Sequence, residues 1–174
     1  AAAGEKKEKK ENAGAETAVG PVSAVGDSVM LGAAEKLGKT VPNVVTIDAE
    51  VGFQAADVIA VLEARRYSGE LGEVVVVHIG SNGVFTAEQF DETMGTLEGV
   101  RRVVFVNVNV PRPWAQPNNE VIAEGVERYP NAVLADWYTA SVAHPEYFVE
   151  DGVHLTIEGQ KAYATLIAEK VEDP

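Results

Sequence analysis

The sequence predicts a single α/β domain in which five parallel strands form a sheet that helices cover on both sides. Three observations support this prediction. Strand-like and helix-like segments alternate from residue 21 onward, which implies right-handed crossovers and a parallel sheet. The segment 74–79 is apolar throughout except for His78, as is typical of a strand buried on both faces. A chain of 174 residues that is 46% hydrophobic also has enough apolar side chains for one sizeable core.

The first half of the chain alternates between short apolar runs and helical spacings. Gly38 is a stop signal for the first helix, and Val58, Ile59 and Leu62 recur at helical spacing in the second. The expected elements are a strand at 21–26, a helix at 30–37, a strand at 44–47, a helix at 55–67 and a strand at 74–79.

The second half continues the same pattern without internal repeats. Gly95 weakens the first helix of this half, whereas the last helix is amphipathic, with Ala162, Leu166 and Ile167 on its inner face. The expected elements are a helix at 87–97, a strand at 102–108, a helix at 119–129, a strand at 132–135 and a helix at 157–171.

The first twenty residues differ from the rest of the chain in composition. They contain four Lys and four Glu and little else but Ala, Gly, Asn and Thr. Such a stretch buries too little apolar surface to offset its ordering entropy, so residues 1–20 are predicted to be a flexible charged linker or tail. Residues 21–174 are predicted to form one folded domain. Because the chain begins in linker-like sequence without an initiator Met, we expect it to be a fragment of a longer protein.

The formal net charge of −13 lies entirely on residues 21–174, because the tail is neutral. An acidic domain is a poor partner for nucleic acid and for an anionic membrane. The absence of cysteine excludes disulfides and thiol chemistry. No apolar stretch reaches the roughly 18 to 20 residues of a membrane span, and no signal peptide opens the chain.

The three histidines lack the spacing of a metal site, so neither a metal nor a cofactor is expected. His78 lies in a valine run and is predicted to be a hydrogen-bonded core residue. His144 precedes Pro145 in an irregular stretch and is predicted to lie at the surface. His154 is the remaining candidate for chemistry.

Three residues are candidates for a nucleophilic triad. Ser28 follows the first strand, and a serine hydroxyl needs a base to take its proton. His154 is the candidate base, and Asp151, three residues earlier, would orient the imidazole and stabilise the imidazolium. Taken alone, Ser28 would be read as a helix N-cap and the Asp151 to His154 segment as a loop contact. Asp136 is the alternative triad acid.

The candidate site residues all follow predicted strands. In a parallel sheet the ligand site lies outside the carboxyl ends of the strands. The first strand is followed by Ser28 and the second by residues 48–52. The third is followed by residues 81–83 and the fourth by residues 109–119. Candidate donors for an oxyanion are the backbone N–H groups of Ser28 and Gly52 and the side-chain amide of Asn82. The competing interpretation is that Gly52 and Asn82 serve only as turn residues.

Four sequence blocks resemble those of the SGNH (GDSL-type) hydrolase superfamily. The blocks are Gly26-Asp27-Ser28, Gly52, Gly80-Ser81-Asn82 and Asp151-Gly152-Val153-His154. The resemblance spans residues 21–174. It implies a flavodoxin-like three-layer α/β/α sandwich, a triad of Ser28, His154 and Asp151, and an oxyanion hole formed by Ser28, Gly52 and Asn82.

Longer segments are similar to the extracytoplasmic C-terminal domain of peptidoglycan O-acetyltransferases. The similarity covers the surroundings of Ser28, residues 47–52, residues 78–83, residues 110–114 and the terminal Asp-Gly-Val-His-Leu-Thr. It implies an extracellular domain that a linker tethers to a membrane acyltransferase-3 domain. Its partners would be an acetyl donor and a carbohydrate acceptor in the cell wall. Several relatives have a polar or basic residue where this chain has Phe53, which is therefore a candidate substrate contact.

The loop at 111–119 could form one wall of an acceptor cleft. Trp114 in this loop could stack on a sugar ring or could simply pack down on the loop. For Asp136 and Trp137, at the end of the fifth predicted strand, we expect structural roles as a cap and as packing.

The function predicted from these observations is serine-dependent O-acetyl transfer to carbohydrate hydroxyls of a cell-wall polymer, with acetylesterase activity when water replaces the acceptor. The first alternative is a plain carbohydrate acetylesterase. A long-chain lipase fits less well, because the loops after the strands are short and polar. The alternative from a different class is a non-catalytic glycan-binding module.

Overall fold

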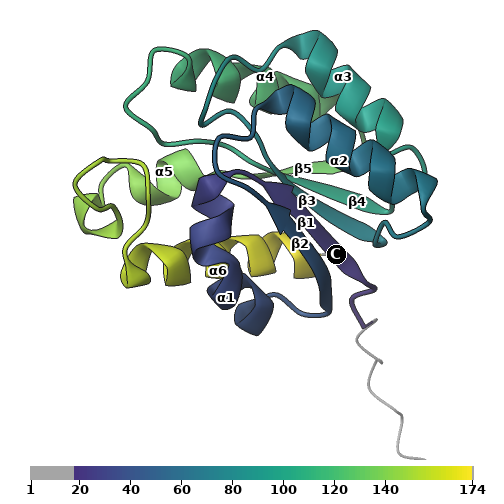
Figure 1. The fold of residues 1–174 in the computed structure, drawn as a ribbon, viewed down its shortest axis with the longest axis horizontal. Coiled ribbons are helices and arrows are strands. Elements are labelled where there is room, and N and C mark those ends of the chain that lie inside the picture. The colour runs from purple at the N-terminus through teal and green to yellow at the C-terminus, as the bar shows by residue number, and fades with distance from the viewer. Residues whose placement is uncertain (1–17, 174) are drawn as a thin grey trace, which may run out of the picture.

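The computed structural model describes residues 18–173, and Figure 1 shows the fold. Its elements are β1 (Val22–Gly26), α1 (Ser28–Thr40), β2 (Val44–Ala49), α2 (Ala55–Tyr67), β3 (Val74–His78), α3 (Ala87–Thr96), β4 (Arg102–Val106), α4 (Ala115–Arg128), β5 (Ala132–Ala135), α5 (Trp137–Ser141), η1 (Pro145–Tyr147, a 3-10 turn) and α6 (Ile157–Glu172). The strands form one parallel sheet in the order β2-β1-β3-β4-β5. This is the strand order of flavodoxin-like doubly wound folds.

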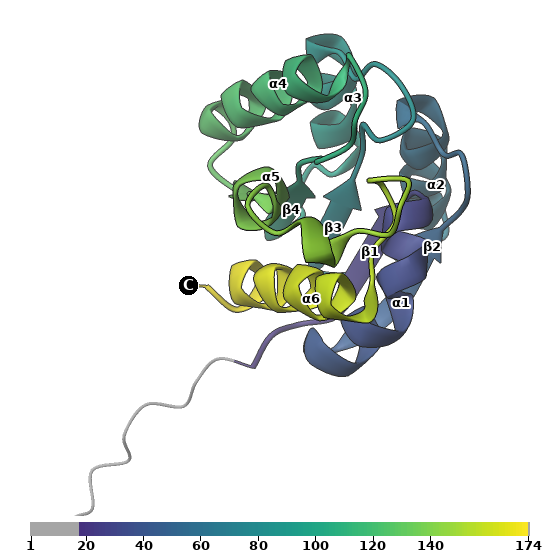
Figure 2. The same ribbon diagram turned by 90° about the vertical axis from the view of Figure 1, so that its left-hand side faces the viewer.

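The domain has three layers. Helices α1 and α6 cover one face of the sheet, and α2, α3 and α4 cover the other (Figures 1 and 2). The two faces follow from the two-residue period of a strand. In β3, Val74 and Val76 face α1 and α6, whereas Val75 and Val77 face the opposite helices. Since both faces are covered, β3 is buried along its whole length, which confirms the fold class predicted from its apolar sequence.

Two helices differ from the predicted bounds for identifiable reasons. Helix α4 begins at Ala115, four residues earlier than predicted, and includes Pro117 in its first turn. Proline is tolerated there because the first N–H groups of a helix have no intrahelical acceptor. Helix α1 continues past Gly38 and ends where Val41, which precedes Pro42, adopts an extended conformation.

Several smaller elements were not predicted. Helix α5 and the turn η1 are too short to show a period in the sequence. Asp136 caps α5 by accepting a hydrogen bond from the Thr139 N–H, and Trp137 is buried, so both predicted structural roles are confirmed.

The N-terminal tail lies almost entirely outside the described residues, so the assignment of residues 1–20 as a linker stays a prediction. Val19, which the prediction assigned to the tail, packs against the core, and its carbonyl accepts a hydrogen bond from the Asn43 side chain. Among residues 18–173, no helix combines the length and the apolar character that crossing a membrane requires.

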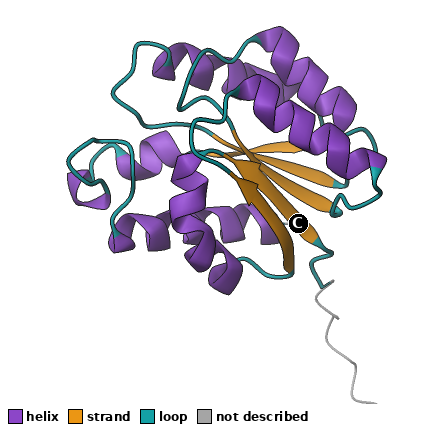
Figure 3. Cartoon of the chain, in the orientation of Figure 1, coloured by secondary structure: helices purple, strands orange, loops and turns teal. Residues whose placement is uncertain are grey.

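The topology places one crevice at the carboxyl edge of the sheet. Strand β2 lies on one side of β1, and β3, the next strand in the sequence, lies on the other side. The direction of winding therefore reverses between β1 and β3. Ligand sites of open α/β sheets lie at this point, outside the carboxyl ends of the strands. The loops that follow the strands gather at the same edge (Figure 3). Ser28 follows β1 and Asn82 follows β3, so both lie at the reversal.

Candidate active site

Ser28 stands at the junction between β1 and α1. Asp27 is the N-cap of α1, and its Oδ1 accepts the Val29 N–H at 2.9 Å, which starts the helix immediately after the strand. Gly26 is tightly enclosed at this turn. A Cβ at that position would lie 3.0 Å from the Met30 side chain and 3.1 Å from that of His78. Ser28 is therefore the first residue of α1 rather than its N-cap, and its backbone N–H is one of the helix donors that lack an intrahelical acceptor.

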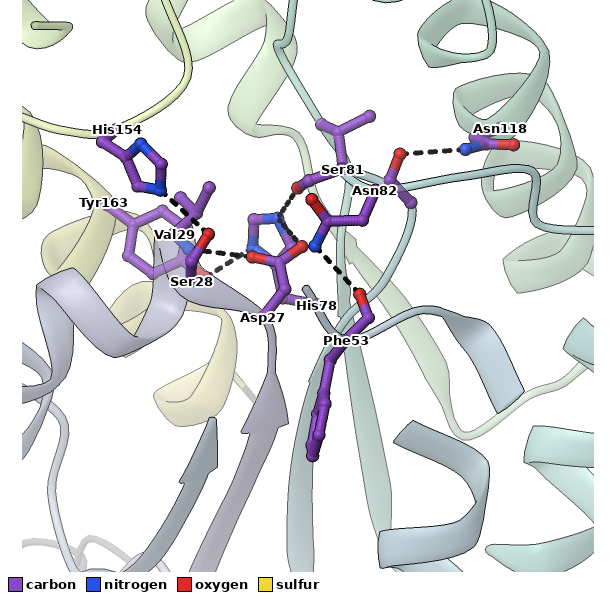
Figure 4. Close-up of polar contacts among 12 residues, drawn as sticks. Asp27, Ser28, Val29, Phe53, His78, Ser81, Asn82, Asn118, His154 and Tyr163 are labelled. Carbon is purple, nitrogen blue, oxygen red and sulfur yellow. Dashed lines mark hydrogen bonds and ion pairs between the residues drawn. The ribbon is translucent and has the colours of Figure 1, made fainter. Parts of the chain in front are cut away.

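The fold brings His154 to Ser28 across 126 residues of sequence. His154 Nε2 lies 2.9 Å from Ser28 Oγ, and His154 Nδ1 lies 2.6 Å from Asp151 Oδ2 (Figure 4 shows Ser28 and His154). The other oxygen of Asp151 accepts the backbone N–H groups of Val153 and His154 at 2.8 and 2.9 Å. These two bonds hold the carboxylate in place on the turn, where Gly152 has a φ of 67°.

The hydrogen bonds to Asp151 lower the pKa of its carboxyl group to about 2. The bond from His154 contributes most, followed by the two backbone N–H groups. Asp151 is therefore a carboxylate at any pH well above 2. Because the pKa is lower than its usual 3.8, the associated stabilisation is complete above pH 3.8 and is lost as the pH falls toward 2. The side chain is 47% exposed, so solvent screens this contribution.

Asp136, the alternative triad acid, is engaged elsewhere. It accepts hydrogen bonds from the Asn107 side chain at 2.8 Å and from the Thr139 N–H at 3.1 Å. Both contacts fix the start of α5. Asp151 is the carboxylate that contacts His154.

The candidate oxyanion donors come from the segments after β2 and β3. Gly52 has a φ of 80° and is exposed in the turn after β2. Asn82 donates one amide hydrogen to the Phe53 carbonyl at 3.0 Å, and its amide group has a second hydrogen to offer. Figure 4 shows the Asn82 side chain beside Ser28, above the ends of β1 and β3. Asn82 thus lies on the same side of the sheet edge as Ser28.

The two predicted substrate-binding residues are placed differently. The ring of Phe53 packs against the core on the α2 side and points away from Ser28 in Figure 4. Trp114 is half-buried, and its indole N–H donates to the Ser81 carbonyl at 3.2 Å. The indole also lines an open, mainly apolar cavity of about 500 Å³ between the segment after Asn82 and the start of α4. Trp114 thus anchors its loop and also forms part of the cavity wall.

Sequence reasoning missed Asn118, which shapes the segment that carries Asn82. Asn118 is fully buried, and its amide donates to the carbonyls of Gly80 and Gly83 at 3.0 and 2.8 Å, while its Oδ1 accepts the Phe85 N–H at 2.8 Å. Gly80 lies so close that a Cβ there would sit 2.9 Å from the Asn118 amide nitrogen. No local pattern marks this residue, because its partners lie more than 30 residues earlier in the sequence.

The two remaining histidines are placed as predicted. His78 is buried and hydrogen-bonded, to the Tyr163 hydroxyl and to Ser81 Oγ. His144 is 45% exposed and pairs with Glu146. Within residues 18–173, no group of three or more His, Cys, Asp or Glu side chains is arranged to hold a metal ion.

The sequence matches no protein-family model but is similar to several characterised chains. It is 38% identical over 149 residues to the O-acetyltransferase OatA of Staphylococcus aureus (strain NCTC 8325 / PS 47), covering 85% of this chain and 24% of the relative. It is 37% identical over 144 residues to the peptidoglycan O-acetyltransferase OatA of Listeria monocytogenes, covering 83% of this chain and 23% of the relative. The chain thus spans about a quarter of the length of these relatives.

Solved structures show the same fold. The C-terminal catalytic domain of the Streptococcus pneumoniae peptidoglycan O-acetyltransferase A superposes with a TM-score of 0.78 at 23% identity, covering 87% of this chain and 92% of that one. A family 3 carbohydrate esterase of Clostridium thermocellum superposes with a TM-score of 0.70 at 14% identity, covering 88% and 95%. The chain therefore has the fold of these solved structures and is a homologue of the matched quarter of the peptidoglycan O-acetyltransferases.

Proposed function

We propose that this domain is a serine-dependent O-acetyltransferase that moves acetyl groups onto carbohydrate hydroxyls of a cell-wall polymer, namely the peptidoglycan that appears in its relatives' names. The observation that carries the proposal is the continuous contact from Asp151 through His154 to Ser28, with distances of 2.6 and 2.9 Å. The names of the relatives supply the group that is transferred.

In the proposed first half-reaction, His154 Nε2 takes the proton of Ser28 as Oγ attacks the carbonyl carbon of an acetyl donor. Asp151 holds the imidazole in the required tautomer and stabilises the imidazolium. The N–H groups of Ser28 and Gly52 and the amide of Asn82 bind the developing oxyanion. Collapse of the tetrahedral intermediate returns the proton from His154 to the leaving group and leaves an acetyl ester on Ser28.

In the second half-reaction, a sugar hydroxyl gives its proton to His154 and attacks the acetyl-serine ester. A second tetrahedral intermediate forms in the same oxyanion hole, and its collapse releases the acetylated sugar and returns the proton to Ser28. If water attacks instead, the products are acetate and free enzyme. This mechanism uses the protein's side chains and backbone alone, without a metal or cofactor.

The proposed partners and location follow from the relatives. In S. aureus and L. monocytogenes, the matched region is part of a protein that is about four times as long. We propose the same arrangement here, with a charged linker that tethers the domain to a membrane acyltransferase domain and holds it outside the cell. The acidic surface makes nucleic acid an unfavourable partner.

A plain carbohydrate acetylesterase is the second candidate. It is favoured by the exposure of His154, whose side chain is 47% accessible, because water can then reach the acetyl-serine ester. The shared fold of a carbohydrate esterase is compatible with either reaction. A glycan-binding module has no need for the contact between Ser28 and His154, which weighs against the non-catalytic alternative.

The experiment that tests the proposal is mass spectrometry of chito-oligosaccharide incubated with an activated acetyl ester and either the wild-type protein or Ser28→Ala. We expect acetylated sugar from the wild type alone. Release of acetate without acetylated sugar, on several oligosaccharide acceptors, would favour the esterase. Equal turnover by both proteins would overturn the role of Ser28, and no turnover by either would favour the glycan-binding module.

Trp114→Ala is expected to lower acetyl transfer to sugar several-fold more than hydrolysis of a small acetyl ester. The indole lines the open cavity beside the segment that carries Asn82, where an aromatic face can stack on a sugar ring. Trp114→Phe is the matched control, because it keeps an aromatic face and loses only the N–H bond to Ser81. The two rates are measured together by mass spectrometry and acetate release. Equal loss of both activities in Trp114→Ala would contradict an acceptor role.

A further inference from the structure

A cluster of four polar side chains lies next to Ser28 and Asn82 and takes no part in the proposed mechanism. It consists of Asp27, His78, Ser81 and Tyr163, which are 1%, 1%, 4% and 0% exposed (Figure 4). We call these residues the buried polar cluster. Burying so many polar groups is unfavourable unless they are satisfied by one another.

His78 is the centre of this cluster. Its Nδ1 lies 2.6 Å from the Tyr163 hydroxyl and its Nε2 lies 3.2 Å from Ser81 Oγ. The same Nε2 lies 3.9 Å from Asp27 Oδ2. Asp27 Oδ1 caps α1, whereas Oδ2 is buried without a hydrogen-bond partner among residues 18–173.

The cluster determines where the proton of His78 resides. Burial lowers the pKa of His78, against an opposing effect of Asp27, so the ring is neutral at neutral pH. Burial also raises the pKa of Tyr163, with a further contribution from Asp27, so the phenol keeps its proton. That proton has Nδ1 as its acceptor at 2.6 Å, which leaves the ring proton on Nε2. There it faces Ser81 Oγ and the unpaired oxygen of Asp27.

The cluster joins the two segments that form the site. Asp27 directly precedes Ser28, and Ser81 directly precedes Asn82. Strands β1 and β3, which lead into these segments, are neighbours in the sheet. A change in the position of the His78 ring would therefore move the nucleophile relative to an oxyanion donor.

We propose that His78 is a positioning residue whose Nε2–H, directed at Asp27 Oδ2 and Ser81 Oγ, holds Ser28 and Asn82 at the spacing that the oxyanion requires. The inference rests on the proposed function, because it assigns His78 a part in the same acetyl-transfer site. His78 does not touch the reacting atoms. It acts through Asp27 and Ser81.

The test is a comparison of His78→Gln with His78→Asn. Both substitutions replace the ring with a neutral amide. The longer Gln side chain can place an N–H near the position of Nε2, whereas Asn reaches only the position of Nδ1. We expect kcat for 4-nitrophenyl acetate to be roughly tenfold lower in His78→Asn than in His78→Gln, at equal KM. This loss is smaller than the roughly 10²–10³-fold fall in kcat that follows removal of an oxyanion donor, because the donor is displaced and not removed. A role in packing alone would reduce kcat equally in the two variants, and this outcome would overturn the proposal.

A second comparison covers the case in which these variants fail to fold. Tyr163→Phe removes only the hydroxyl that donates to Nδ1, and Tyr129→Phe, which removes a surface hydroxyl bonded to Asp91, is the matched control. We expect Tyr163→Phe to lower kcat several-fold at unchanged KM and the control to leave both unchanged. The loss should shrink when Asn82 is already Ala, because the cluster acts through that donor. Equal losses in both backgrounds would contradict the inference.

Ser28→Ala, measured in parallel, separates this inference from the proposed function. If Ser28→Ala keeps the turnover of the wild type, the proposed function itself fails. If turnover depends on Ser28 but the paired His78 variants are equal, only the role of His78 is refuted.

Discussion

We expect kcat for acetyl-ester turnover to fall by the same factor, roughly 10⁴ to 10⁶, in Ser28→Ala, in His154→Ala and in the double variant. The physical reason is that the two side chains act as one unit. Ser28 Oγ has no nucleophilic power without a base at 2.9 Å, and His154 has no proton to take once the hydroxyl is gone. The rate that remains comes from binding and the oxyanion donors.

The measurement is kcat and KM for 4-nitrophenyl acetate in all three variants. His144→Ala is the matched control, because His144 also pairs with a carboxylate, at 2.8 Å, but belongs to the α5 to η1 segment. We expect the control to keep wild-type kcat. If the losses of the two single variants multiply in the double variant, Ser28 and His154 act independently, and the proposed proton transfer between them is wrong.

The pH profile gives an independent check on the same unit. The hydrogen bonds to Asp151 hold its pKa at about 2, so this carboxylate stays ionised through the range in which activity is measured. Protonation of Asp151 should therefore make no contribution to the acid limb of the pH profile in that range.

Asn82→Ala is expected to lower kcat by roughly 10²–10³-fold while KM changes little. The amide would bind the oxygen only when it carries negative charge, so its loss affects the transition state more than the ground state. Acylation of Ser28 and transfer to an acceptor should suffer equally, because both steps pass through a tetrahedral intermediate.

The matched control for this prediction is Asn131→Ala. Asn131 also donates its amide to a backbone carbonyl, that of Val100 at 2.8 Å, but it lies at the opposite edge of the sheet, just before β5. The control should keep kcat and lose only a little thermal stability. Steady-state kinetics and thermal unfolding distinguish the two effects. A rise in KM without a fall in kcat for Asn82→Ala would assign the amide to substrate binding rather than to the oxyanion.

The elements that were predicted correctly are those whose signal is local. Strand β3 is recognisable because it is apolar on both faces, and α2 because its apolar residues repeat at helical spacing over 13 residues. Errors arose where one residue outweighed the pattern. Gly38 ended the predicted first helix too early, whereas α1 continues to Thr40. The start of α4 was predicted four residues too late, and the four residues include Pro117, which fits the first turn of a helix.

The contacts among Ser28, His154 and Asp151 were expected from their residue types and positions, whereas the contact between His78 and Tyr163 was not. Asp151 and His154 lie three residues apart, so a turn alone can join them. The contact between His154 and Ser28 spans 126 residues, and that between His78 and Tyr163 spans 85. For Trp114, the structure added a hydrogen bond to Ser81 that the sequence did not suggest.

By itself the sequence determined the α/β class, the order of the main elements and the residue types available for acyl transfer. These properties depend on side-chain periodicity and on which residues follow a strand, and both are written within a few consecutive positions. The tertiary structure alone decided that Asn118 holds the Asn82 segment, that Phe53 turns toward the core, and that His78 meets Asp27 and Tyr163. Each of these contacts joins segments that meet only after the crossover helices pack on the sheet, so no local pattern could specify them.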